Sequence, residues 1–454
     1  MQVLERFRYW AGIFVPAVVV GLIVVLIVSS MSRSDISELR NLVLAGASIV
    51  GIVVVIFVPA RYLPSLALVS FILLPPSMMP NAFKVIVPGT IILWVWVVRR
   101  KVSFGSVAVL GFFWGTALFS VASAAFSVDS ASSGTWILTF FMSLIPALIV
   151  SPSREERDLL EKTFLCAAGF LGLYGILEFL TKRNLVYGAL QSLFGSDFSV
   201  QHWSTYRPTM TFGHPIPAAA FMAVATAIVM AIWMQRRTVG TGVVLLLSLS
   251  GLVVPQTRGG IFAFGFAALV AVAFAMFTQR ASKWRARLLG LCAICIIALL
   301  FVSAHTNILS RFQSGEALSA LVQRQRTFPI ILDAIGGMDH PFGLGPGVPV
   351  EVLGGDLAGL GYVENFYLQA LLGLGWLGAI FLFAFMGSIF WSAWRSQYLG
   401  GVLGLLAFFA VIATFNAFDG YSSIFVLFSV LIMYSKSADQ GLQSDGAGRL
   451  FASG

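Results

Sequence analysis

The chain has 454 residues, of which 58% are hydrophobic and only 10% are charged, and its mean hydropathy is +0.92. Soluble domains contain about 25% charged residues, so this composition excludes a soluble fold and predicts an all-α, polytopic membrane protein. The net charge is +9, but most basic residues fall in short loops that would face anionic lipid headgroups, which argues against a nucleic-acid partner.

Apolar segments follow one another along nearly the whole chain, and most are long enough to cross a hydrocarbon core of about 30 Å as helices. The third and fourth segments are interrupted by Pro75, Pro76 and Pro80, so they could form a re-entrant hairpin instead of two crossings. We predict about 12 to 14 transmembrane helices, at 9–30, 42–60, 64–80, 85–98, 105–126, 133–150, 163–181, 216–234, 240–256, 260–278, 288–304, 364–391, 400–417 and 421–434.

Most Lys and Arg residues fall on one side of this topology, which the positive-inside rule makes cytoplasmic. Both termini are then cytoplasmic, and a single transmembrane domain spans 1–436, followed by a disordered tail at 437–454. Two larger loops lie on the periplasmic face, at 182–215 and 305–363. The cytoplasmic residues would be Arg6, Arg8, Arg61, Arg99, Arg100, Lys101, Arg154, Arg157, Lys162, Arg236, Arg237, Arg280, Lys283, Arg285, Arg287, Arg395 and Lys436.

Within the second periplasmic loop, the segment GEALSALVQRQRTFPIILDAIGGM alternates aliphatic and polar residues at helical spacing. We expect it to form short amphipathic helices on the external face, interrupted at Pro329. The three cysteines, Cys166, Cys292 and Cys295, all fall in predicted spans, and the Cys-x-x-Cys pair has no second pair or histidine to complete a metal site. We expect them to be buried and unreactive.

The stretch from Asp339 to Gly378 combines ionisable groups, glycines and aromatics in an otherwise lipid-like sequence. Polar groups at a membrane boundary cost free energy, so a functional site is expected there. The spans themselves are almost free of charge, and Glu178 lies close enough to a helix end to pair with Lys182 four residues further on.

Three motifs together resemble those of the bacterial O-antigen ligase and O-antigen polymerase superfamily. They are YRPTMTFGHPIPAAAF at 206–221, TRGGIFAFGFAALVA at 257–271 and DHPFGLGPG at 339–347. The family's loop signature is similar to His-Asn, nine residues, then Gly-x-x-Gly. This chain has Glu364-Asn365, nine residues, then a Gly-x-x-Gly that begins at Gly375. Glutamate in place of histidine favours a polymerase-like member over a ligase.

The resemblance implies a bacterial inner-membrane enzyme that transfers a glycan, without a metal or other cofactor. The donor would be an undecaprenyl-diphosphate-linked oligosaccharide, used at the periplasmic face. The acceptor would be a sugar hydroxyl on a growing glycan or, for a ligase, on the lipid A core. A chain-length regulator is a further partner that such an activity implies.

A lipid diphosphate needs permanent cations, and the planar guanidinium group of arginine binds phosphate oxygens in pairs. Arg258 is the first candidate because it opens a helix beside two glycines, where backbone amides also favour an anion; it could instead anchor that helix at the interface. Arg207, in a Tyr-Arg-Pro turn, is the second, with a solvated loop charge as the alternative. Arg324 and Arg326 point to different helix faces, and we favour Arg326, although contact with lipid headgroups would explain both.

The acceptor hydroxyl must lose a proton, and a positioned general base typically contributes about 10² to 10⁴ in rate. Glu364 is our candidate base, with helix capping as the alternative role. His340 is a competing base that could equally bind sugar or stabilise the loop.

Three alternating glycines, Gly343, Gly345 and Gly347, lack the strand and helix context of a nucleotide-binding loop. We expect them to form a flexible lid over the lipid-linked sugar. Asn365 and Tyr367 would bind the sugar from the start of the next helix, although aromatics at a membrane interface commonly form a belt.

A lipid-linked glycan flippase or secondary transporter is the alternative outside the glycosyltransferases, because the span count suits it equally. Transporters usually place ionisable residues in the middle of broken spans. Here the polar residues gather in the two predicted external loops, which favours chemistry at the membrane surface.

Overall fold

A computed structural model describes most of the membrane domain and confirms the all-α class: the described residues form helices and contain no strand. The predicted spans 9–30 and 288–304, most of 42–60, and the predicted tail at 437–454 lie outside the described residues. The residues that the structure describes are 55, 57–73, 88–100, 106–188, 206–277, 315–337, 341–349, 352–353, 357, 363–396, 398–415 and 423–436.

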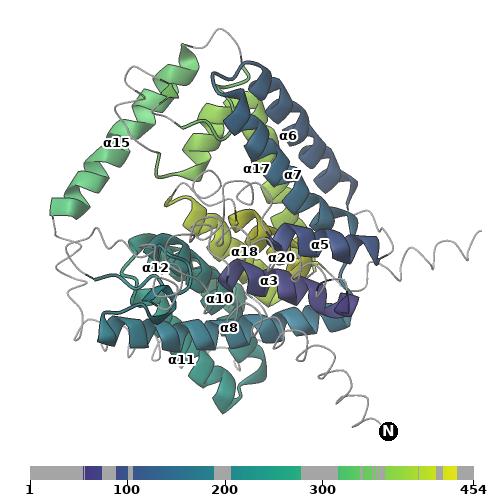
Figure 1. The fold of residues 1–454 in the computed structure, drawn as a ribbon, viewed down its shortest axis with the longest axis vertical. Helices are drawn as coiled ribbons and strands as arrows, with labels where there is room; N and C mark the ends of the chain where they lie inside the picture. Colours follow the sequence, from purple (N-terminus) through teal and green to yellow (C-terminus); the bar gives the residue numbers. More distant parts are fainter. Residues whose placement is uncertain are drawn as a thin grey trace, which may run out of the picture.

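The helices follow the hydrophobic segments of the sequence in order, and Figure 1 shows their arrangement. Their bounds are η1 Ala60–Tyr62, α3 Leu63–Leu73, α5 Pro88–Val98, α6 Val107–Ala125, α7 Ser130–Ile149, α8 Arg154–Thr181, α10 Pro215–Arg236, α11 Val239–Val253, α12 Arg258–Phe277, α15 Gly315–Gly336, α17 Phe366–Arg395, α18 Leu399–Ile412 and α20 Ile424–Ser435.

Five of the described helices are long and apolar enough to cross a membrane by length and composition: α6, α7, α8, α10 and α17. Several others are apolar but shorter. The described parts of α3 and α5 have eleven residues each. Residues 74–87 between them lie outside the described residues, so the re-entrant alternative stays a prediction.

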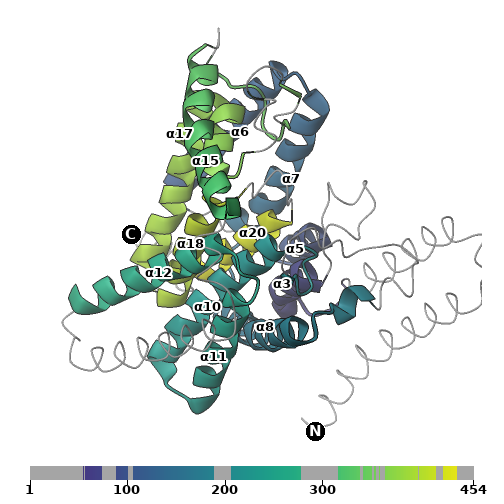
Figure 2. The same ribbon diagram turned by 90° about the vertical axis from the view of Figure 1, so that its left-hand side faces the viewer.

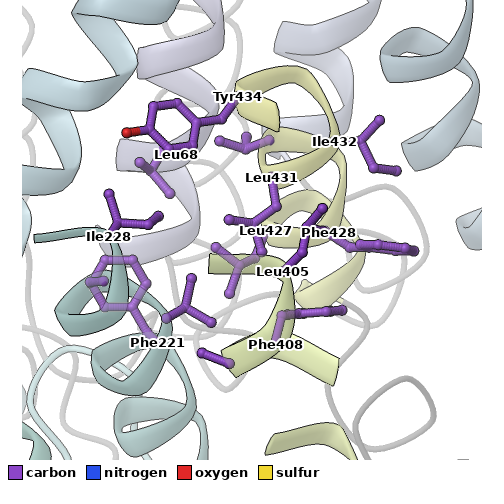
Figure 3. Close-up of a cluster of buried hydrophobic side chains, with 14 of the residues drawn as sticks. Leu68, Phe221, Ile228, Leu405, Phe408, Leu427, Phe428, Leu431, Ile432 and Tyr434 are labelled. Carbon is purple, nitrogen blue, oxygen red and sulfur yellow. The ribbon is translucent and has the colours of Figure 1, made fainter. Parts of the chain in front are cut away.

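The core is centred on α10, which packs against α8, α11, α12 and α18. Alanine and glycine residues at the contacts let these helices approach closely. A β-carbon at Gly260 of α12, for example, would lie 3.0 Å from the backbone of Ala219 in α10. Figure 3 shows the aromatic and aliphatic side chains between α3, α10, α18 and α20. Phe408 and Phe428 stack there with ring centroids 5.0 Å apart.

The remaining long helices form a second group, in which α6 packs on α7 and on α17. Figures 1 and 2 show α6 beside α7 and α17; α15 contacts α17, but most of its length stands apart from that helix in Figure 1. The contact between α15 and α17 is a small apolar cluster that includes Ile331, Ile335, Leu371 and Leu372.

One end of the molecule gathers many of the residues that the sequence assigned to the cytoplasm, and we call it the basic end. Ion pairs join Arg61 to Glu155 (2.7 Å), Arg100 to Glu156, and Arg236 to Glu161. The Nζ atom of Lys436 donates to the carbonyl oxygens of Leu148 and Val150, at the end of α7. The basic end therefore brings together η1, α5, α7, α8, α10 and the end of α20.

Helix α8 begins nine residues before the predicted span at 163–181 because its first turn is capped at the basic end. Ser153 and Glu156 form a reciprocal capping box, which satisfies amides that would otherwise lack partners. Glu156 and Glu178 lie about 33 Å apart along this helix at 1.5 Å per residue. That distance is close to the thickness of a hydrocarbon core, so α8 joins the two polar ends of the membrane domain.

Two local predictions were wrong. Pro329 does not interrupt the amphipathic segment, because α15 continues through it as one helix; a proline removes one backbone hydrogen bond, which the rest of a 22-residue helix tolerates. Cys166 is exposed on the surface of α8 rather than buried. Cys292 and Cys295 lie outside the described residues.

Candidate functional site

At the end of α8 opposite the basic end, the buried carboxylate of Glu178 holds a turn of the chain. Its Oε1 accepts hydrogen bonds from the amide group of Asn184 (3.1 Å), the hydroxyl of Tyr206 (3.0 Å) and the backbone N–H of Thr209 (3.0 Å). Its Oε2 accepts from the backbone N–H of Met210 (2.8 Å). The sequence suggested a pair with Lys182, but the carboxylate instead binds residues 206–210.

This turn brings Arg207 next to the segment that precedes Arg258. The Nε atom of Arg207 donates to the carbonyl oxygen of Pro255 at 3.2 Å, three residues before Arg258 opens α12. Two of the arginines predicted to bind diphosphate therefore lie at one corner of the molecule. We call this corner the Arg258 end.

The backbone at the Arg258 end is unusual. Met210 and Gln256 have left-handed conformations, with φ of 52° and 55°, which residues other than glycine adopt in only a few per cent of cases. Met210 is fully buried, and its methyl group lies so close to Gly175 of α8 that a β-carbon there would be 2.5 Å away. Packing against α8 offsets the local strain.

His214 is the N-cap of α10 and lies beside this corner. Its Nδ1 accepts a hydrogen bond from the backbone N–H of Ile216 at 3.2 Å, so the ring's proton is on Nε2 when the imidazole is neutral. Burial and the positive charge of Arg207 lower the pKa of His214 to about 4. The imidazole is therefore neutral at physiological pH, and Arg207 supplies the positive charge of this pair.

The end of α18 links Arg258 to Glu364. Thr414, just past α18, packs on the residue after Arg258: a β-carbon at Gly259 would lie 2.1 Å from the Thr414 hydroxyl. The hydroxyl of Tyr367, three residues after Glu364, donates to the carbonyl oxygen of Phe409 at 2.8 Å. Phe409 lies in the last turn of α18 and Thr414 two residues past its end, so both contacts are made near the same end of α18.

Asn365 fixes the start of α17 and with it the position of Glu364. Its side-chain oxygen accepts hydrogen bonds from the backbone N–H groups of Tyr367 (2.9 Å) and Leu368 (3.2 Å), which is the bonding of an N-cap. Glu364 is partly exposed and immediately precedes this cap. Asn365 and Tyr367 thus have structural bonds, and their binding of sugar remains a prediction.

The glycine-rich loop is packed into a break in α17, which differs from the flexible lid expected from the sequence. Helix α17 breaks at Gly375, whose φ is 68° and ψ −176°. The backbone N–H groups of Leu344 and Gly345 donate to the carbonyl oxygens of Leu372 and Gly373, both at 3.0 Å. These bonds join the loop to carbonyl groups beside the break.

The glycines are required there for close approach. Gly343, Gly345 and Gly347 all have positive φ, and a β-carbon at Gly343 would lie 2.4 Å from the amide nitrogen of Gly375. The hydroxyl of Ser123 in α6 donates to Gly373 and accepts from the N–H of Gly345. The glycine-rich loop at 343–347 and the Gly-x-x-Gly motif that begins at Gly375 thus form one structural joint between α6 and α17.

The structure describes the other candidate site residues only in part. Arg326 is exposed on α15, on the turn before the apolar residues that contact α17. The side chain of Arg324 and the whole of His340 lie outside the described residues, so their roles remain predictions.

The residue that sequence reasoning undervalued is Glu178. Its signal was present, since a carboxylate within an apolar helix is costly unless it has a specific use. Spacing along the helix suggested Lys182 as the partner, whereas the donors are Asn184, six residues on, and three residues that lie 28 to 32 residues further along the chain. Asn184, Tyr206 and Thr209 could not be assigned to it without the tertiary structure.

Comparison with known families identifies the region that contains these elements. Residues 243–383 match the family model described as O-Antigen ligase. This match, over about a third of the chain, supports membership of the O-antigen ligase and polymerase superfamily. No curated protein matches the chain.

The matched O-antigen ligase region contains Arg258, Arg326, the glycine-rich loop, Glu364 and the break in α17. Arg207 and Glu178 lie before it, and the bond between Arg207 and Pro255 joins the preceding part of the chain to the matched region. The match and the apolar helices indicate an integral membrane protein of a glycan-transferring type, and the family implies in general a lipid-linked glycan donor and a glycan acceptor.

Proposed function

We propose that this protein is an inner-membrane glycosyltransferase that uses an undecaprenyl-diphosphate-linked glycan as donor and a sugar hydroxyl as acceptor. Polymerisation of O-antigen or exopolysaccharide repeat units is the favoured activity. The observation that supports it best is the meeting of Arg207 and the start of α12 at the Pro255 turn. Two arginines close together suit a ligand with two adjacent anionic phosphates.

In this proposal Arg258 and Arg207 bind the diphosphate, and Arg326 approaches it from α15. The amides at the start of α12 add favourable partial charge for the same anion. The leaving group departs with its negative charge already stabilised by the arginines, so the donor needs no acid catalyst and no metal.

Glu364 acts as the general base in this scheme. The acceptor oxygen attacks the anomeric carbon, the bond from that carbon to the phosphate oxygen breaks, and the hydroxyl proton passes to the carboxylate of Glu364. Attack opposite the leaving group inverts the anomeric configuration. His340 is the second candidate for this step, and Asn365 and Tyr367 hold the start of α17 while contacting the sugar.

The second candidate function is ligation of the finished glycan to the lipid A core. The family match supports it, because its description is O-Antigen ligase. Glu364, where the family signature resembles His-Asn, favours polymerisation. Both activities use the same donor chemistry and differ in the acceptor.

Analysis of lipid-linked glycans in a strain lacking the gene separates these activities. Loss of a polymerase leaves single repeat units on the lipid carrier, whereas loss of a ligase leaves long chains there. Restored polymer formation by the wild-type gene is the control. An unchanged profile of lipid-linked glycans would contradict both activities and favour a transport function.

A further inference from the structure

Glu178 is a buried carboxylate whose hydrogen-bond partners are all neutral. Only 1% of the residue's surface is exposed, and its donors are Asn184, Tyr206, Thr209 and Met210. A buried ionised group is stable only when hydrogen bonds replace its lost hydration. Donors on both carboxylate oxygens satisfy that requirement.

Three of these donor residues surround Arg207 in the sequence. Tyr206 precedes it directly, and Thr209 and Met210 follow within three positions, so Glu178 holds the chain on both sides of the arginine. Arg207 itself is bound through Nε to Pro255. Arg207 is thus located by the contacts of its neighbours with α8 and by its own contact with the segment before α12.

We propose that Glu178 is a positioning residue that holds Arg207 in place to bind the donor diphosphate together with Arg258. The inference rests on the proposed function for the role of the two arginines. Because the donors to Glu178 are neutral, its carboxylate orders the turn without forming an ion pair with Arg207. The carboxylate thus acts on Arg207 through the backbone and the neighbours of the arginine, and Arg207 is held from the other side by its own bond to Pro255.

A carboxylate suits this task better than an amide. It presents two acceptor oxygens, and each receives a backbone N–H of the turn: Thr209 on Oε1 and Met210 on Oε2. Glutamine would replace one oxygen with an NH₂ group, which would face a donor from either Met210 or Thr209. Glu178→Gln should therefore loosen the turn while preserving the volume of the side chain.

A double-mutant cycle tests whether Glu178 acts through Arg207. The full chain in lipid nanodiscs is titrated with undecaprenyl diphosphate for Glu178→Gln, Arg207→Ala and the double variant. Each single change is expected to weaken binding about 10-fold or more, the effect of losing a hydrogen bond to a charged group. The double variant should bind no more than about 2-fold worse than Arg207→Ala. Independent, multiplying losses would overturn the inference.

Glu161→Gln is the matched control, because Glu161 is a buried glutamate of the same helix at the basic end. It should leave the affinity for undecaprenyl diphosphate unchanged. A loss equal to that of Glu178→Gln would mean that any damage to α8 lowers affinity, and the specific role of Glu178 would be rejected.

Hydrogen exchange of the 206–210 amides tests positioning without any ligand. Glu178→Gln should speed exchange at Thr209 and Met210 about 10-fold or more, whereas Glu161→Gln should not. Unchanged exchange would overturn the positioning role whatever the binding result. Faster exchange in a protein whose wild type fails to bind undecaprenyl diphosphate would retain the contact but reject the proposed function, so the two failures are distinguishable.

Discussion

The two ends of α8 use buried glutamates in opposite ways. At the basic end Glu156 and Glu161 pair with Arg100 and Arg236, so the carboxylates neutralise arginines and fasten helices together. At the Arg258 end Glu178 accepts only from neutral groups. The same residue type in one helix thus neutralises cations where the fold needs stability and orders a cation-bearing turn where we propose that an anion binds.

The comparison also separates two kinds of arginine. Arg236 has its partner within the chain, as expected for a residue that orients and anchors a membrane protein. Arg207 bonds to a backbone carbonyl and lies in a turn that Glu178 orders. A guanidinium group that the fold already positions needs little rearrangement to bind a ligand.

The largest expected effect is at the proposed base. Glu364→Gln should lower the rate of glycan transfer by about 10² to 10⁴, because the amide cannot accept the acceptor's proton. Incorporation of lipid-linked repeat units into polymer measures this rate. The matched change at the basic end, Glu155→Gln, removes only a partly exposed ion pair with Arg61 and should alter activity little. Full-length polysaccharide in cells that express Glu364→Gln would exclude Glu364 as the base.

The next effect distinguishes the two kinds of arginine directly. Arg258→Lys keeps the charge but loses the planar pair of donors, so affinity for undecaprenyl diphosphate should fall about 10- to 100-fold. Arg236→Lys at the basic end should leave that affinity unchanged. Titration of both variants in nanodiscs gives the comparison. Near-normal affinity in Arg258→Lys would assign Arg258 to anchoring α12 at the interface.

The joint between the glycine-rich loop and α17 gives a smaller effect, on stability. Gly375→Ala places a β-carbon 2.0 Å from the carbonyl oxygen of Pro341 at a φ of 68°, and should destabilise the protein by about 3 kcal/mol. Gly387→Ala in the same helix meets open space and should be neutral or slightly stabilising. Thermal unfolding in detergent compares them. Equal stability of the two variants would mean that the joint is loose.

The smallest effect concerns pH. The pKa of His214 is about 4 in the folded protein, below its value near 6.5 in an unfolded chain. The folded state then binds fewer protons between these values, so this contribution is fully present above pH 6.5 and is lost as the pH falls toward 4. It amounts to at most about 3 kcal/mol. Melting temperatures from pH 4 to 7 should show this loss, and His214→Gln should reduce it; an equal pH dependence in both proteins would refute it.

Sequence alone determined the class, the order of the helices and the basic residues of one end. Helical membrane segments follow from apolar length, and the positions of charges between them follow from the cost of placing charge in lipid. Helix capping was only the alternative that the sequence offered at Glu364, and the structure gives that bonding to the next residue, Asn365. These features depend on residues that are close together in the chain.

Only the tertiary structure decided which distant segments meet. The partner of Glu178, the insertion of the glycine-rich loop at Gly375, and the approach of Arg207 to the start of α12 all join segments that are far apart in sequence. Helix periodicity gives the face of a residue but not the neighbour that covers it, because that neighbour is selected by the packing of whole helices. The sequence therefore gave the candidate groups of the site, and packing brought them to one end of the molecule.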